Sequence, residues 1–285
     1  MSDLTIEILG SGGAYTIPLP LCQCRVCSEA RQKGGVYARK GPCVFIHGPN
    51  ILFDTPEEIK DMLNRSDIKD IQACFYSHWH PDHTAGKRVW EMNRNERKGG
   101  VVRTTPVYIP QQVAEDFKVR MAINDHLELL DRRELISLRR MTDGDQATIG
   151  QTMVKPFRLA EKYVYGFDIR INKKFILVLM DELFEWQPQI EHENADIVIL
   201  PAGIFEFHPL TGERQLPADH KLFKSEATHI QTLEMIHKMK PKQVIFMHIE
   251  EGDKLGFDEL KLYEQKLVEQ GIPACFSYDT MKISL

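Results

Sequence analysis

Residues 77–86 read SHWHPDHTAG and hold three histidines and one aspartate within six positions, namely His78, His80, Asp82 and His83. In extended backbone, His78 and His80 project to the same side and can bind one ion. A proline-bent turn then brings Asp82 and His83 toward a neighbouring ion. Imidazole and carboxylate groups bind Zn²⁺, Mn²⁺ or Fe²⁺ in preference to Ca²⁺. The spacing H-x-H-x-D-H therefore predicts a metal centre.

Three apolar runs end at an ionisable residue. The runs ACFYS, FILVLM and QVIFM lead directly to His78, Asp181 and His248. Burial of an ionisable group without a partner costs free energy, and one shared metal centre would give all three a partner. The alternative is that each strand end simply reaches solvent. Because the three strand ends occur together with the histidine-rich motif, we favour a shared metal centre.

Short apolar runs alternate with helical patterns along the chain. We expect strands at 4–11, 51–55, 71–77, 106–110, 152–159, 164–172, 174–181, 195–202, 242–248, 273–278 and 281–285. We expect helices at 56–66, 84–92, 111–123, 225–239 and 257–271. The runs between 152 and 181 are typical of antiparallel strands with short connections. This order predicts an α/β fold, an αββα sandwich, in a single domain over residues 1–285.

The 285 residues have a formal net charge of −5 and an isoelectric point near 6.1. A protein that binds a nucleic-acid polymer usually presents a basic face. We interpret the basic runs at 93–100 and 131–140 as solvated turns and a solvated helix face. We therefore expect a small-molecule substrate and no nucleic-acid polymer.

No apolar run is long enough for a membrane helix, so no membrane partner is expected. The first residues, MSDLTIEILGSGG, lack the basic start and long apolar stretch of a secretory signal. These features predict a cytoplasmic protein. A homodimer is an open alternative to a monomer.

The six cysteines are unevenly distributed. Cys22, Cys24 and Cys27 form the pattern C-x-C-x₂-C, whereas the remaining three lie in apolar, strand-like runs. In a reducing compartment, crowded cysteines favour a metal over disulfides. Three thiolates at this spacing can bind one tetrahedral ion and leave the fourth position to a distant residue. The alternative is three unliganded thiols in a loop.

The motif HWHPDH, with LGSGGA at 9–14, LFDTP at 52–56 and MHIE at 247–250, resembles the metallo-β-lactamase-fold hydrolases over nearly the whole chain. The resemblance implies the same αββα sandwich. It also implies two divalent active-site metals, Zn, Mn or Fe. Their ligands would be His78 and His80 for the first ion, Asp82, His83 and His248 for the second, and Asp181 as a bridge.

The run CQCRVC narrows the resemblance to the subgroup that contains the cyclic phosphodiesterase of the phosphonate-degradation (C–P lyase) operon and a pyrroloquinoline-quinone accessory protein. It implies that Cys22, Cys24 and Cys27 bind a structural zinc in a loop at about 18–30. In that subgroup the fourth ligand is a histidine three positions after the late metal histidine. Glu251 stands at that position here and is the candidate ligand.

The chain departs from this subgroup at the first metal. The subgroup supplies another histidine six residues before a strand glycine, and here Ala160 stands at that spacing from Gly166. The first ion would keep His78, His80 and Asp181 unless the neighbouring Glu161 or solvent completes it. The alternatives are a weaker first site, a single-metal enzyme, or altered chemistry.

Further residues are candidates for supporting roles. The resemblance places a general acid near His229, in the first turn of an expected helix, although a partly exposed helix histidine is the alternative. Asp54 is expected to support the metal ligands through hydrogen bonds. His208 and His220 lie in a long polar segment that is a candidate lid or pocket wall.

The resemblance implies hydrolysis of a small phosphodiester, including a cyclic one, by water activated between the two metals, with Asp82 and His229 as the catalytic residues. One alternative is an ester, thioester or lactone hydrolase on the same fold. The other is a non-hydrolytic accessory protein that binds metal, which the alanine at position 160 favours. An enzyme is favoured by the retained residues Asp82, His83, Asp181 and His248. Beyond two active-site metals and one structural zinc, we expect no cofactor.

Overall fold

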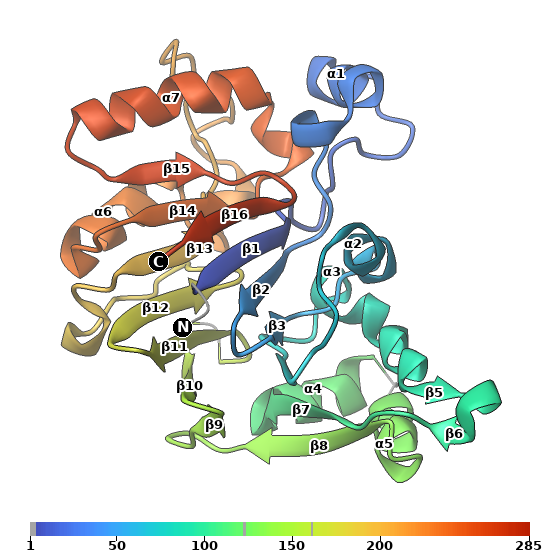
Figure 1. Ribbon diagram of the computed structural model, residues 1–285. Helices are drawn as coiled ribbons and strands as arrows, with labels where there is room; N and C mark the ends of the chain where they lie inside the picture. The colour runs from blue at the N-terminus through green and yellow to red at the C-terminus, as the bar shows by residue number, and fades with distance from the viewer. Residues whose placement is uncertain (1–3, 122–123, 161) are drawn as a thin grey trace.

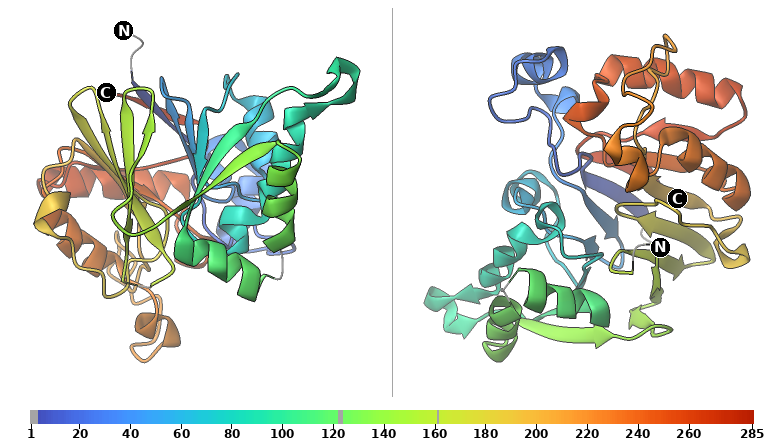
Figure 2. Two further views of the ribbon diagram at one scale, coloured as in Figure 1. Left: turned by 90° about the horizontal axis from the view of Figure 1, so that it is seen from below. Right: turned by 180° about the vertical axis from the view of Figure 1, so that it is seen from behind.

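Two seven-stranded sheets pack against each other in the computed structural model, which describes residues 4–121, 124–160 and 162–285. Helices cover the outer face of each sheet (Figures 1 and 2). The predicted αββα sandwich is confirmed.

The first sheet has the order β16-β1-β2-β3-β4-β7-β8. Its strands are β16 Met281–Ser284, β1 Thr5–Gly10, β2 Cys43–His47, β3 Ile51–Phe53, β4 Ala73–Phe75, β7 Thr105–Pro110 and β8 Ile136–Met141. The second sheet has the order β15-β14-β13-β12-β11-β10-β9. Its strands are β15 Ala274–Phe276, β14 Val244–Met247, β13 Ile197–Pro201, β12 Lys174–Leu179, β11 Tyr165–Ile171, β10 Thr152–Arg158 and β9 Ala147–Ile149.

The α-helices lie outside the sheets or in the loops at their edges. They are α1 Arg25–Lys33, α2 Ile59–Arg65, α3 Pro81–Thr84, α4 Gln111–Arg120, α5 Asn124–Arg132, α6 His229–Met239 and α7 Phe257–Glu269. The short 3₁₀ segments include η2 Ala85–Asn93, η5 Lys221–Lys224 and η6 Glu251–Asp253, and β5 Arg94–Asn95 pairs with β6 Gly100–Val101 as a separate small hairpin. No helix in the described ranges has the length and apolarity that crossing a bilayer requires.

Three apolar layers hold this arrangement together. Ile8 and Phe75 of the first sheet meet Phe167 and Val178 of the second in the central layer. The outer layers join the first sheet to α2, α4 and α5, and the second sheet to α6 and α7. Strand β12 alternates between two of these layers, so both of its faces are buried. This explains why its sequence, KFILVL, is an almost unbroken apolar run.

Parallel strand pairs place the polar strand ends together. Strands β3, β4, β7 and β8 are mutually parallel in the first sheet, as are β12, β13, β14 and β15 in the second. The carboxyl ends of parallel strands form one edge, where open α/β sheets place their ligand sites. His78 follows β4, Asp181 follows β12 and His248 follows β14. The run from 152 to 181 is antiparallel, as predicted.

Two local predictions were wrong. The expected helix at 84–92 is instead the single turn α3, which begins inside the histidine motif, followed by the 3₁₀ segment η2. The run at 131–140 is helical only at its start, because residues 131–132 end α5 whereas residues 136–140 belong to strand β8, which pairs with β7 at the sheet edge. Arg139 and Arg140 are exposed on this strand, which lies at the edge of the first sheet. The end of the helix expected at 111–123 lies outside the described residues.

Candidate metal centre

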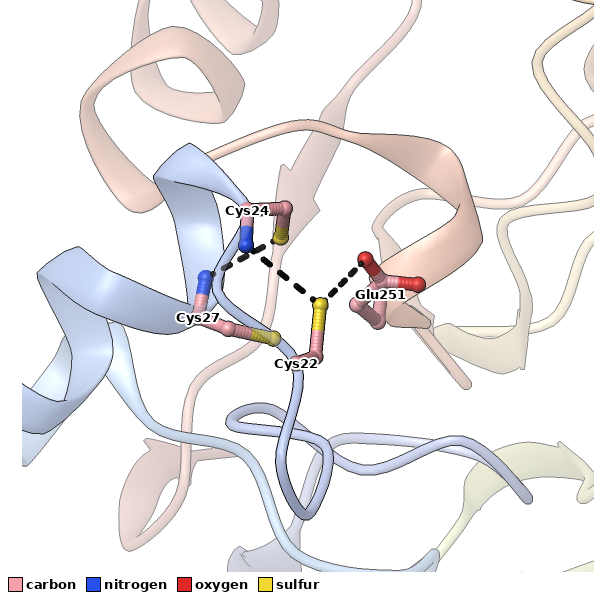
Figure 3. Close-up of side chains that lie close together, drawn as sticks. All are labelled: Cys22, Cys24, Cys27 and Glu251. Atoms are coloured by element: carbon pink, nitrogen blue, oxygen red, sulfur yellow. Dashed lines mark hydrogen bonds between the residues drawn. The ribbon is translucent and has the colours of Figure 1, made fainter.

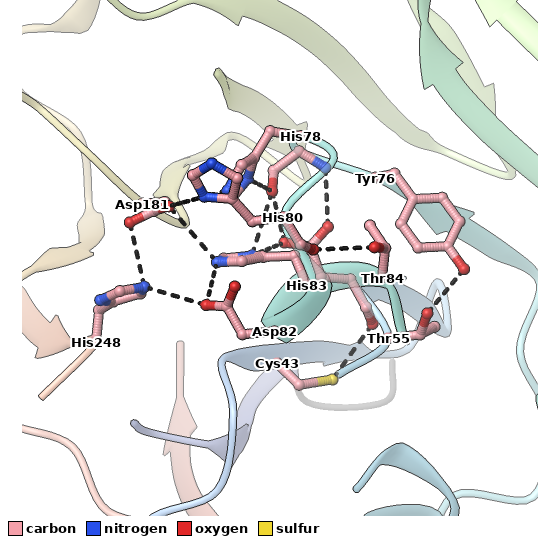
Figure 4. Close-up of polar contacts among 12 residues, drawn as sticks. Cys43, Thr55, Tyr76, His78, His80, Asp82, His83, Thr84, Asp181 and His248 are labelled. Carbon is pink, nitrogen blue, oxygen red and sulfur yellow. Dashed lines mark hydrogen bonds and ion pairs between the residues drawn. The ribbon is translucent and has the colours of Figure 1, made fainter. Parts of the chain in front are cut away.

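The histidine motif forms the connection between strand β4 and helix α3. Pro81 occupies the first position of α3, where its fixed φ angle fits and no backbone N–H is needed. The short helix places Asp82 and His83 one turn beyond the extended segment that holds His78 and His80. The motif therefore presents two pairs of ligands in one direction (Figure 4).

The first cluster consists of His78, His80 and Asp181. The Nε2 atom of His78 lies 2.9 Å from Asp181 Oδ2, and Nδ1 of His80 lies 3.6 Å from the same oxygen. The hydroxyl of Ser77 lies 3.0 Å from Nδ1 of His78, which leaves Nε2 facing the cluster. The predicted ligands of the first metal therefore converge.

The second cluster consists of Asp82, His83 and His248. Asp82 Oδ2 lies 3.3 Å from His83 Nε2 and 3.8 Å from His248 Nε2. Asp181 approaches this cluster too, because its Oδ1 atom lies 3.1 Å from His248 Nε2. Asp181 thus lies between the two groups, in the position that the sequence predicted for a bridging ligand.

The ligand atoms match what divalent ions require. Within each cluster the nitrogen and oxygen atoms lie within 4.8 Å of one another. The Nε2 atoms of His78, His83 and His248 are buried and form no well-aligned hydrogen bond among the described residues, although carboxylate oxygens lie 2.9, 3.3 and 3.1 Å away. Buried polar atoms in folded proteins nearly always have a partner. The two clusters of imidazole nitrogens and carboxylate oxygens therefore fit a pair of Zn²⁺, Mn²⁺ or Fe²⁺ ions, which would give the three Nε2 atoms a partner.

The protonation of the site is coupled to metal binding. Burial, and then the nearby His83, lower the pKa of His78 to about 4, so this imidazole is neutral and able to bind metal. Burial alone would raise the pKa of Asp181, but His248 and the first-cluster histidines hold it well below its usual value. In turn, Asp181 and Asp82 outweigh the effect of burial on His248 and raise its pKa to about 10. An ion bound there must displace that proton.

Asp54 is fully buried behind the second cluster and orients it. Its carboxylate accepts hydrogen bonds from the backbone N–H and hydroxyl of Ser77, at 2.8 and 2.6 Å. Its Oδ2 atom also lies 2.7 Å from Nδ1 of His83. This contact would keep the proton on Nδ1 of His83 and leave Nε2 free to bind an ion in the second cluster. Asp54 therefore has the supporting role predicted from the sequence.

Replacing Asp54 by Asn is expected to weaken metal binding at the second cluster by roughly 10–100-fold, because His83 loses its acceptor. A competition titration with a chelating dye would measure this. Asp67→Asn, whose side chain is 89% exposed, is the matched control. Equal metal affinity in the wild type and Asp54→Asn would refute the orienting role.

Gly13, in the loop after β1, packs against the second cluster. A Cβ atom at this position would lie 2.5 Å from Nδ1 and Cε1 of His248 and from Oε1 of Glu250. The early glycine-rich run therefore leaves room for the imidazole of His248.

Gly13→Ala is expected to displace the His248 ring and to lower metal affinity at the second cluster by about tenfold or more. Gly252→Ala adds the same methyl group where no atom lies within 4 Å, and is the control. Metal titration of both variants tests the prediction. Similar affinities in the two variants would mean that the loop yields instead of the ring.

A cavity of about 300 Å³ opens beside the two clusters. His80, Asp82, Asp181 and His248 line it on one side. The other walls include four further acidic residues, Glu182, Glu226, Glu250 and Asp253. Burial, and then a hydrogen bond to the carboxyl group of Glu226, raise the pKa of Glu182. Sequence reasoning missed these acids, although Glu182 directly follows the ligand Asp181.

The structure does not bring His229 into this cavity. Its side chain is buried, with Nδ1 at 2.6 Å from the carbonyl oxygen of Ala202 and Nε2 at 3.0 Å from the hydroxyl of Tyr263. Burial lowers the pKa of His229 to about 4. Both ring nitrogens therefore have partners away from the metal ligands, and this placement gives no support to the predicted general acid.

The polar segment before α6 contributes to the cavity wall only at its ends. Gly203, Ile204 and Glu226 line the cavity. His208 lies instead 3.7 Å from Glu259, and His220 caps the short segment η5. Neither of these two histidines lines the cavity.

The first cluster is bounded by the turn between β10 and β11. Ala160 is exposed in this turn, and Glu161, the candidate replacement ligand, lies outside the described residues. The ring of Tyr163 lies 5.8 Å from that of His80, measured between centroids, and also lines the cavity. Among the described residues, the first cluster thus has three protein ligands.

Cys22, Cys24, Cys27 and Glu251 form a third group, separate from the cavity (Figure 3). Cys22 Sγ lies 3.2 Å from Oε1 of Glu251. The backbone N–H of Leu19 donates to Cys27 Sγ at 3.2 Å, a contact that favours a thiolate. Three sulfurs and one carboxylate fit a tetrahedral structural zinc. The structure therefore brings the candidate Glu251 to the predicted cysteines.

Comparisons with known proteins agree with the fold. The model of the family described as "Beta-lactamase superfamily domain" matches residues 49–249. None of the curated proteins compared with the chain matches it.

Among solved structures, a diphosphatase from the PhnP family is 21% identical, with a TM-score of 0.71, and the match covers 99% of this chain and 98% of that one. Zn²⁺-bound PqqB from Methylobacterium extorquens is 14% identical, with a TM-score of 0.66 and coverage of 99% and 100%. The short form of human tRNase Z is 17% identical, with a TM-score of 0.62 and coverage of 98% of each chain.

Proposed function

The chain belongs to the β-lactamase superfamily and has the metallo-β-lactamase fold, and on this premise we propose that it is a metal-dependent hydrolase of a small phosphodiester. The observation that supports the proposal most strongly is the position of Asp181. Its two carboxylate oxygens approach ligands of both clusters, at 2.9 Å from His78 and 3.1 Å from His248. Such a shared carboxylate suits a pair of ions that act on one substrate.

The residues of the chain would divide the work as follows. His78, His80 and Asp181 hold one ion, while Asp82, His83 and His248 hold the other, and Asp54 keeps His83 in its binding tautomer. When bound, the two divalent ions would lower the pKa of a water molecule and neutralise negative charge on the phosphoryl oxygens. The cavity beside both clusters is large enough for a small substrate, which would be oriented by its walls.

The proposal that the chain belongs to the phosphodiesterase subgroup rests on the run CQCRVC and on the zinc site that its cysteines would form. The pattern accompanies that subgroup, and the diphosphatase similar in fold is named as a member of the PhnP family. Zn²⁺-bound PqqB shares the fold as well, so a binding protein without hydrolytic activity is the second candidate. The specific observation that favours this alternative is the three-ligand first cluster beside Ala160.

Metal analysis followed by paired assays tests the proposal. Elemental mass spectrometry of untagged protein prepared without chelators should find one ion for each ligand group, about three per chain. The loaded protein should hydrolyse bis(p-nitrophenyl) phosphate faster than a thioester substrate.

Other results would point to other functions. About two ions per chain, one lost in Cys22→Ser and the other in His83→Ala, would mean a single active-site ion. The two-ion mechanism would then be wrong. Preference for the thioester would identify a carbonyl hydrolase, and turnover of neither substrate by fully loaded protein would favour the accessory function.

A further inference from the structure

The cavity beside the candidate metal ligands is lined by further acidic residues. Besides the ligands, the lining contains Glu182, Glu226, Glu250 and Asp253, and no lysine or arginine among the described residues. A pocket for a purely anionic substrate would normally have a cationic side chain near the phosphate. Among the described residues that line this cavity, the part that could attract an anion is therefore the two ligand clusters, through the metal ions that they would hold.

Two of these acids are occupied by their own loop. The backbone N–H of Glu250 donates to Asp253 Oδ2 at 2.9 Å. Oε1 of Glu250 also lies 3.9 Å from Nδ1 of His248. Glu250 and Asp253 therefore form the turn that holds His248 and are less available to a ligand.

Glu182 and Glu226 are different, because they face each other. Both side chains line the cavity, where burial, and then a hydrogen bond to Glu226, raise the pKa of Glu182. In the part of the chain that the structure describes, neither forms an ion pair with a lysine, arginine or histidine. Oε1 of Glu182 does accept hydrogen bonds from the backbone N–H groups of Phe184 and, at 2.9 Å, Ala227. Glu226 is thus the carboxyl group most open to a cationic partner in the cavity.

An independent observation points to a ligand at the same place. Thr232, on the first turns of α6, is fully buried and lines the cavity. Its hydroxyl has no hydrogen-bond partner among the described residues. A buried hydroxyl without a partner costs free energy, which a bound ligand can recover. The hydroxyl oxygen is an acceptor, as are the carboxyl oxygens of Glu182 and Glu226.

Resting on the proposed function, we propose that the substrate is zwitterionic, and that a primary ammonium group on its alcohol part binds at Glu182, Glu226 and Thr232. An ammonium group has three N–H donors and no acceptor, which matches a wall of acceptors. The phosphate would face the metal clusters at the other side of the cavity. One zwitterionic substrate would thus bind the metal clusters through its phosphate and the acidic residues through its ammonium group.

Calorimetry on the metal-loaded protein tests this without turnover. The probes are 2-aminoethyl, 3-aminopropyl and 4-aminobutyl phosphate, each compared with the n-alkyl phosphate of equal chain length in which methyl replaces ammonium. At least one aminoalkyl phosphate should bind about tenfold more tightly than its partner, because charge-assisted hydrogen bonds have that strength.

Two variants locate the effect. Glu226→Gln and Thr232→Val should each reduce the preference for the amine to about threefold or less. Glu234→Gln removes the same charge from an exposed position on the same helix and should leave the preference unchanged.

Three results would overturn the inference. One is equal affinity within every pair of probes, and another is no binding of any aminoalkyl phosphate. The third is loss of a metal ion in Glu226→Gln, which would show that the acids hold an ion. Continued hydrolysis of bis(p-nitrophenyl) phosphate would then preserve the proposed function while this inference fails.

Discussion

Asp181→Asn is expected to lower phosphodiester hydrolysis by at least about a thousandfold, because one substitution weakens both metal sites. Asp181 lies 2.9 Å from His78 and 3.1 Å from His248, and it is the only residue that approaches both clusters this closely among those described. An amide in its place offers one oxygen and no charge. The kcat/KM value on bis(p-nitrophenyl) phosphate and the metal content should therefore fall together.

Asp219→Asn, at an exposed position away from the cavity, should retain the wild-type activity and metal content. A different pattern would refute the bridging role of Asp181. If Asp181→Asn kept both ions and most of its activity, the two clusters would have to act independently. Loss of a single ion with unchanged turnover would mean that only one cluster performs the reaction.

Cys22→Ser is expected to lose one zinc ion per chain and to lower the free energy of unfolding by at least about 3 kcal/mol. Cys22 and Cys24 lie before α1 and Cys27 lies within it, whereas Glu251 follows β14. A zinc ion bound by these four residues would therefore join segments far apart in the sequence. Because the ion binds the folded chain, its loss removes that binding free energy. Denaturant unfolding and elemental analysis would measure the two effects.

Cys275→Ser is the matched control, since Cys275 lies on β15 outside the zinc group. It should keep its full zinc content and lose much less stability. Glu251→Gln should have an effect between the two, because three cysteines remain. If Cys22→Ser and Cys275→Ser were equally stable and equally rich in zinc, the cysteine group would not be a structural site.

The convergence of the candidate ligands could be predicted because it depends on local spacing and on strand ends. The pattern H-x-H-x-D-H defines its own geometry within six residues, and a polar residue directly after a buried strand lies at the sheet edge. For this reason His78, Asp181 and His248 converge as expected. Glu251 became a candidate only through the resemblance, which places the fourth zinc ligand three positions after His248.

The other features of the site and of the fold depend on contacts between distant segments, which no local sequence pattern encodes. His229 begins an amphipathic helix whether it faces the cavity or, as found, the carbonyl of Ala202. Glu226 becomes part of the site only because the chain before α6 folds back beside Glu182. The basic run ending in Arg140 reads equally well as a helix face or an edge strand. Only its pairing with β7 decides between them.

The division of the ligands between two sheets has a consequence for folding. His78 and His83 follow a strand of the first sheet, whereas Asp181 and His248 follow strands of the second. The complete centre therefore exists only after the central apolar layer has formed, and such contacts between distant segments form late and slowly. Divalent ions at this centre would act mainly by slowing the unfolding of the finished structure, with little effect on how fast it forms.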